Sequence, residues 1–129
     1  MPSKTVISTN KAPKAIGPYS AGIQMGNLIY TAGQLGIDPT SGELVSGGVE
    51  AETRQAIKNL QSILQSVGAD LEDVVKTTVF LQDISDFSRM NSVYAEFFPN
   101  KPPARSAVGV VALPKNGSVE IEAIAVISD

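Results

Sequence analysis

The sequence predicts an α+β fold, a two-layer sandwich in which two helices cover one face of a mixed, six-stranded sheet. Three observations predict this fold. Six short segments are rich in β-branched and apolar residues, two longer segments repeat apolar residues every three to four positions, and the connecting loops are short. A length of 129 residues fits one domain spanning 1–129 and leaves little room for another.

The N-terminal part of the chain predicts three strands. Residues 4–8 read KTVIS, a short β-branched segment followed by the loop TNKAPKAIGPY. Segments 20–25 and 28–33 flank Gly26 and Asn27, which suit a two-residue turn. These two segments therefore predict a hairpin.

The two predicted helices span residues 49–67 and 86–98. Gly68 ends the first helix as a left-handed residue would, and Ser85 and Pro99 bound the second as its N-cap and stop. The inner face of the first helix carries Thr53, Ala56, Ile57, Leu60, Ile63, Leu64 and Val67. The inner face of the second carries Phe87, Met90, Tyr94, Phe97 and Phe98, with Asn91 at its border.

The remaining strands are predicted at residues 74–81, 105–113 and 118–127. The last two are apolar at consecutive positions and hence on both faces, although two helices can cover only one face of the sheet. A second copy of the chain is the cover that we expect. The alternative is that small residues such as Ala107 and Ala123 tolerate exposure.

Composition excludes several classes of function. The chain has no cysteine and no histidine, which removes thiolate nucleophiles, disulfides and the commonest general base and metal ligand. A net charge of −3 provides no basic surface for nucleic acid. No apolar run is long enough for a bilayer, and the N-terminus lacks a hydrophobic leader, so we expect a cytoplasmic protein.

Arg105 is the most informative single residue, because it stands alone among small and apolar residues in PPARSAVGVVALP. On a strand it shares a face with Ala107 and Gly109. A guanidinium at that position is exposed, paired with a carboxylate, or free to bind an anion.

Two carboxylates follow in SVEIEAIAV. Glu120 and Glu122 point to the same side of a strand, where burial is costly without a partner. If Asn116 and Gly117 close a simple hairpin, Glu120 lies on the order of 25 Å from Arg105. The two then meet only through another strand or subunit. The alternative is that each glutamate pairs with a nearby lysine or faces water.

Four stretches together resemble the RidA/YjgF family of imine deaminases. They are AIGPYSAGIQMGNLIYTAGQLGIDPTSGELV, VVKTTVFLQDISDFSRMNSVYAEFF, PPARSAVGVVALP and VEIEAIAV, and the resemblance runs from about residue 6 to 127. It implies a chorismate-mutase-like fold and a homotrimer with ligand clefts between subunits. It also implies hydrolysis of 2-imino acids to 2-oxo acids and ammonia, with neither a metal nor another cofactor.

The resemblance also implies roles for individual residues. Arg105 matches the arginine that binds the substrate carboxylate, and Glu120 matches the glutamate that holds or activates the attacking water. Gly33 matches a glycine whose backbone contacts the ligand, while Tyr19 and Asn91 match residues lining the cleft. Tyr19 could instead pack a loop, and Asn91 could instead bridge helix contacts.

The sequence departs from the family pattern at two positions. Ala32 stands where many members have serine, and Ala107 stands where some have cysteine, so the preferred imino acid stays open. Two other functions also remain open: a non-catalytic module, either a holdase or a binder of small carboxylates, and an endoribonuclease. The acidic net charge argues against the ribonuclease.

Overall fold

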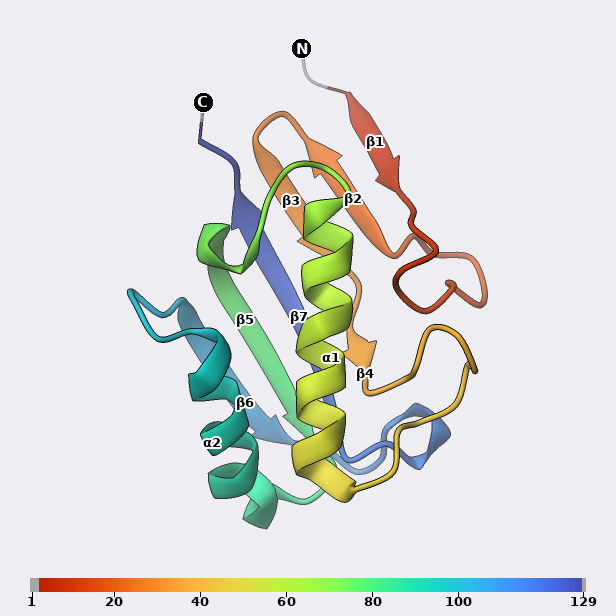
Figure 1. Cartoon of the computed structure of the whole chain (residues 1–129), viewed down its shortest axis with the longest axis vertical. Coiled ribbons are helices and arrows are strands. Elements are labelled where there is room, and N and C mark those ends of the chain that lie inside the picture. The colour runs from red at the N-terminus through yellow and green to blue at the C-terminus, as the bar shows by residue number, and fades with distance from the viewer. Residues whose placement is uncertain (1–2, 129) are drawn as a thin grey trace.

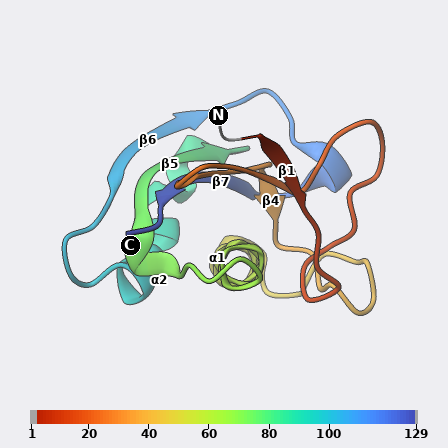
Figure 2. The same cartoon turned by 90° about the horizontal axis from the view of Figure 1, so that it is seen from above.

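In the computed structural model, which describes residues 3–128, two α-helices lie on one face of a single mixed sheet (Figures 1 and 2). The strands are β1 (Lys4–Ile7), β2 (Gly22–Met25), β3 (Leu28–Thr31), β4 (Gln34–Leu35), β5 (Val74–Leu81), β6 (Ala104–Gly109) and β7 (Val119–Val126). The helices are α1 (Gly48–Gln65) and α2 (Phe87–Phe97). The predicted α+β class, with two helices and a mixed sheet, is confirmed.

The sheet has seven strands where the sequence predicts six. Its order is β1-β2-β3-β7-β5-β6, and the additional short strand β4 also pairs with β7. The chain leaves the sheet after Thr31 and returns at Gln34, opposite Ile121 of β7. Two residues are too few to show an alternating pattern, so β4 was merged with the strand predicted at 28–33.

The last two strands do not form the simple hairpin considered from the sequence. β5 lies between them, parallel to β6 and antiparallel to β7. The crossover from β5 through α2 returns the chain at the outer edge of β5, so β6 never reaches β7. The residues expected to close the hairpin instead form a short turn over Pro114–Asn116, in which Lys115 and Asn116 both have positive φ values.

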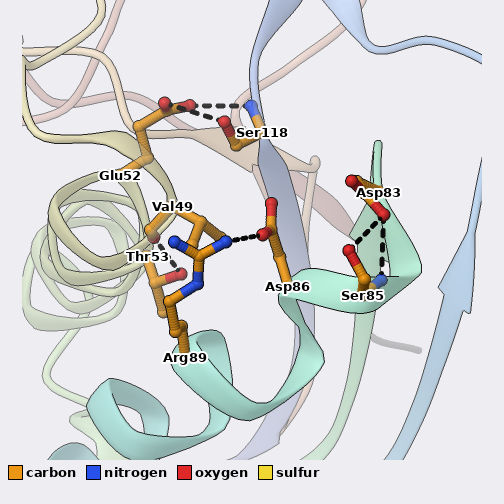
Figure 3. A network of polar contacts seen from close by, with 8 residues as sticks. All are labelled: Val49, Glu52, Thr53, Asp83, Ser85, Asp86, Arg89 and Ser118. Carbon is orange, nitrogen blue, oxygen red and sulfur yellow. Dashed lines mark hydrogen bonds and ion pairs between the residues drawn. The ribbon is translucent and has the colours of Figure 1, made fainter.

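Both helices lie close to their predicted positions, but the predicted cap of the second is wrong. A 3₁₀ turn over Ile84–Asp86 precedes α2, and the Asp83 carboxylate accepts hydrogen bonds from the backbone and side chain of Ser85 (Figure 3). Ser85 therefore does not cap the helix. Gly68 has the predicted left-handed conformation, with φ of 85°.

The core lies between the helices and the near face of the sheet. On α1 the buried residues include Ala56, Ile57, Leu60, Ile63 and Leu64, all fully buried. On α2 Met90 and Tyr94 are buried, as the pattern predicts, and Val93 joins them. No helix in residues 3–128 has the length and apolar character needed to cross a membrane.

Within residues 3–128 no helix covers the far face of the sheet (Figure 2), and apolar side chains are exposed on this face. Each strand alternates, so that Ile29 and Ala125 face the core, whereas Tyr30 and Ile124 face the other way. The large apolar residues on this face that are 40–58% exposed are Val6, Met25, Leu28, Tyr30 and Val108. We call this set the open apolar face.

Candidate active site

Three of the predicted site residues line one cleft. Tyr19, Gly33 and Glu120 border a cavity of about 280 Å³, and two loops add Lys14 and Lys115 to its walls. The segments that build it are far apart in the sequence: the loop before β2, the bend between β3 and β4, the turn before β7, and β7 itself. The cleft thus combines one carboxylate with two lysines.

Gly33 has a specific steric reason to be glycine. A Cβ atom at this position would lie 2.8 Å from Oε2 of Glu120 and 2.9 Å from its Cδ, closer than such atoms pack. The carboxyl group of Glu120 therefore lies directly over the backbone of the bend. In this chain the space that the missing side chain leaves is used by Glu120.

Glu120 is a half-buried acid. Burial raises the pKa of its carboxyl group, and the neighbouring charge of Glu122 raises that pKa further. Within residues 3–128 no group donates a hydrogen bond to its side chain. A carboxylate with a raised pKa and free acceptor positions is suited to take a proton from a water molecule or a ligand.

Arg105 and Asn91 form a second group. Nη1 of Arg105 donates a hydrogen bond to Oδ1 of Asn91 at 2.7 Å. The guanidinium carbon lies 4.7 Å from the ring centre of Tyr94 and 5.3 Å from that of Phe87. The three α2 residues follow one another at spacings of four and three, so they share one face of the helix.

The position of Tyr94 is itself fixed. Its hydroxyl lies 2.7 Å from Oγ1 of Thr77, and both side chains are buried. Burial raises the pKa of the Tyr94 phenol, which keeps it neutral. Thr77 pairs with Arg105 across β5 and β6. The strand pairing therefore holds the Tyr94 ring, through Thr77, next to the Arg105 guanidinium.

Among the described residues, none forms an ion pair with the Arg105 guanidinium. In the part of the chain that the structure describes, the salt bridges are Arg54 with Glu96 and Arg89 with Asp86. With only one of its hydrogen bonds directed at Asn91, the planar group keeps further donors for a ligand. Of the three states considered for this arginine, the structure excludes the carboxylate pair within residues 3–128.

The two groups lie on opposite faces of the sheet. Arg105 is level with Thr77 and Ala123, which face the helices, whereas Glu120 is level with Phe80 on the far side. Three residues of strand rise and two strand spacings separate their backbones, on the order of 14 Å. One copy of the chain therefore cannot bring both side chains to one small ligand.

Sequence reasoning missed part of each group. Phe87 and Tyr94 were expected only as core residues, and Lys14 was not singled out. The spacing of Phe87, Asn91 and Tyr94 is the signal that could have revealed them, because it places one polar residue between two aromatics. Within residues 3–128 no three metal-ligating side chains gather in one place.

The chain matches the family model described as Endoribonuclease L-PSP over residues 9–127. The chain belongs to the RidA/YjgF family. It is 54% identical to the mouse protein named 2-iminobutanoate/2-iminopropanoate deaminase, a match covering 95% of this chain and 91% of that one.

Solved structures of the RidA/YjgF family have the same fold. RidA from an Antarctic Psychrobacter matches with a TM-score of 0.92 and 46% identity, over 95% of this chain and 99% of that one. TdcF from E. coli, solved with bound serine, matches with a TM-score of 0.92 and 40% identity, over 96% and 99% of the two chains.

Proposed function

We propose that this protein hydrolyses reactive 2-imino acids, such as 2-iminopropanoate and 2-iminobutanoate, to 2-oxo acids and ammonia. Relatives at about 54% identity carry the name of this activity. The observation that supports it best in this chain is Arg105, a guanidinium held by Asn91 and two aromatic rings and paired with no carboxylate within residues 3–128. A planar carboxylate meets such a group through two parallel hydrogen bonds.

Glu120 supplies the chemistry in this proposal. The carbon of a protonated imine is electrophilic, so a positioned water molecule and a proton acceptor are enough for attack. Water adds to that carbon while Glu120 accepts its proton, which gives a carbinolamine. The proton then goes to the nitrogen and the C–N bond breaks, which releases ammonia. As the C=O bond of the 2-oxo acid forms, Glu120 accepts the proton of the hydroxyl group.

The active site in this proposal forms between two copies of the chain. Because Arg105 and Glu120 lie on opposite faces of the sheet, a second copy must supply one of them. The open apolar face provides a surface that such copies would cover. A closed ring of three copies, as the family resemblance implies, would repeat this interface three times.

The first test measures trapping of the imine by semicarbazide. An amino acid oxidase or a serine/threonine dehydratase releases the imine, and wild type, R105A and E120A compete with the trap. Wild type should lower semicarbazone formation, and both variants should leave it unchanged. If wild type leaves trapping unchanged, the deaminase proposal fails for these substrates.

The shared site is tested by mixing the two inactive variants. In the proposed arrangement an R105A chain supplies Glu120 and an E120A chain supplies Arg105. After co-expression of equal amounts, about one quarter of randomly formed interfaces hold the intact pair, so activity returns. A mixture that stays inactive would place both residues within one copy's site and contradict the proposal.

The family model also bears the name of an endoribonuclease. The net charge of −3 gives little attraction for RNA. Incubation of the purified protein with a labelled single-stranded RNA, at low and high salt, tests this activity directly. Cleavage that R105A and E120A both retain would assign the nuclease to another site.

A further inference from the structure

Among the described residues, one buried polar group outside the cleft is a charged side chain, that of Glu52. Glu52 lies on α1 and is only 6% exposed, on the same buried side as Val49 and Ala56. Within residues 3–128 neither ion pair includes Glu52. A buried carboxylate without a cation is costly, so its hydrogen-bond donors should matter to the fold around it.

Both donors come from one residue, Ser118. Its backbone N–H donates to Oε1 of Glu52 at 2.8 Å, and its hydroxyl donates to Oε2 at 3.1 Å (Figure 3). Ser118 immediately precedes β7, the strand that carries Glu120. Glu52 thus fixes the chain two residues before the proposed proton acceptor.

The other side of Ser118 is held as well. Its carbonyl accepts a hydrogen bond from the backbone N–H of Gln82 at 3.1 Å, and the Gln82 side chain donates to Asn116 at 3.0 Å. Asn116 and Lys115 have φ values of 56° and 57°, a conformation that persists only where the surroundings enforce it. The turn leading into β7 is therefore anchored from α1 and from the end of β5.

Glu52 also packs against Gly36, which directly follows the cleft residues Gln34 and Leu35 of β4. A Cβ atom on Gly36 would lie 2.5 Å from Cα of Glu52, so the segment after β4 packs directly on the helix at this point. β4 in turn follows the bend at Gly33 and pairs with Glu120 through Leu35. Glu52 therefore contacts both the segment that leads into β7 and the segment that contains β4, which together enclose the Glu120 carboxyl group.

We infer that Glu52 is a positioning residue: by holding Ser118 and packing on Gly36, it fixes where the Glu120 side chain stands in the cleft. This inference rests on the proposed function. Arg105 belongs to the other group of site residues, so Glu52 acts on turnover and leaves carboxylate binding alone. A displacement of about 1 Å in a reacting group can lower a rate by as much as a hundredfold.

The test compares two substitutions of matched size. In E52M the side chain keeps its length but accepts no hydrogen bond from Ser118. In E52Q the amide oxygen accepts from the backbone N–H, and the amide N–H donates to the serine hydroxyl. E50Q is the control, because Glu50 lies on the same helix and is exposed.

Two quantities are measured for each variant: imine turnover against semicarbazide, and the Kd for 2-oxobutanoate by calorimetry. E52M should lose about tenfold in turnover while its Kd stays within about twofold of wild type. E52Q should keep more than about half of wild-type turnover, and E50Q should match wild type. Should E52M not fold, S118A removes only the hydroxyl contact and should lower turnover about threefold with Kd unchanged.

The outcomes separate the inference from the proposal beneath it. Wild type that fails to compete with semicarbazide overturns the deaminase function. Wild type that competes, beside E52M with a lower melting temperature but full turnover, reduces Glu52 to a stabilising contact and overturns the inference. If E52M instead loses turnover and 2-oxobutanoate binding equally, the inference is also overturned.

Discussion

Replacing Arg105 with lysine tests whether the shape of the cation, and not only its charge, binds the ligand. Lysine keeps the positive charge but offers a point donor in place of a planar fork. The bond from Arg105 to Asn91 exists in the free protein, so its loss largely cancels between the free and bound states. The loss that counts is one of the two parallel hydrogen bonds to the ligand carboxylate.

The size of the effect follows from that one bond. A hydrogen bond between charged groups contributes about 1.5–3 kcal/mol, and about 1.4 kcal/mol corresponds to a tenfold change in Kd. The Kd of R105K for 2-oxobutanoate should therefore rise about 10- to 100-fold, and R105A should show no measurable binding. Titration calorimetry at one pH and salt concentration measures both.

The matched control is R54K. Arg54 also contacts an aromatic ring, with its guanidinium carbon 5.8 Å from the ring centre of Phe97, but it is paired with Glu96 at 2.9 Å. It is not placed in either group of site residues, so R54K should bind as wild type does. If R105K binds as tightly as wild type, the argument from planar geometry is refuted, whatever R105A does.

Four further predictions concern residues in or beside the site. Because the pKa of Glu120 is raised in the folded chain, the fold loses stability as pH rises from the ordinary carboxyl range through that raised pKa. E120Q should therefore have a higher melting temperature than wild type at pH 8 but not at pH 4. An equal rise in melting temperature at both pH values would contradict this. E122Q should move the acid limb of the pH–activity profile to lower pH, because it removes a negative charge that raises the pKa of Glu120. If the acid limb does not move, it reports the titration of a group other than Glu120. G33A should lose most turnover while remaining folded by circular dichroism, because its new methyl group would lie 2.8 Å from the Glu120 carboxylate; full activity would mean that this carboxylate can move freely. Y94F should lower the free energy of unfolding, measured by urea denaturation, by about 1–3 kcal/mol. The Y94F/T77V double variant should lose less of this free energy than the sum of the losses of the two single variants. Strict additivity would show that the two buried hydroxyl groups do not interact.

Local patterns in the sequence were enough to predict the helices and most of the strands. The three-to-four spacing of apolar residues located α1 to within a residue or two at each end, because burial against a sheet requires that spacing. β4 escaped prediction because its two residues hold their place through pairing with β7, a contact about 85 positions away in the chain.

The site was predictable as residues but not as an arrangement. Alternation along one strand correctly gives Glu120 and Glu122 the same side. Which side Arg105 takes relative to them depends on β5 lying between the two strands, and strand order is a property of the whole sheet. Likewise, aromatic residues at helical spacing fill a core in most proteins, so Phe87 and Tyr94 alone predict only core residues. The polar Asn91 between them is the one sign in the sequence that these rings also face a guanidinium.

In the proposed assembly, the separation of Arg105 and Glu120 by the thickness of the sheet would also make turnover depend on protein concentration. A dissociated chain would keep its core, its helices and the Arg105 group intact, because none of these depends on a neighbour. Such a chain would still attract a carboxylate but could not turn it over. In the proposed assembly, dilution would therefore convert a deaminase into a weak binder of small carboxylates without unfolding it. Two functions that the sequence left as alternatives would then be two association states of one molecule.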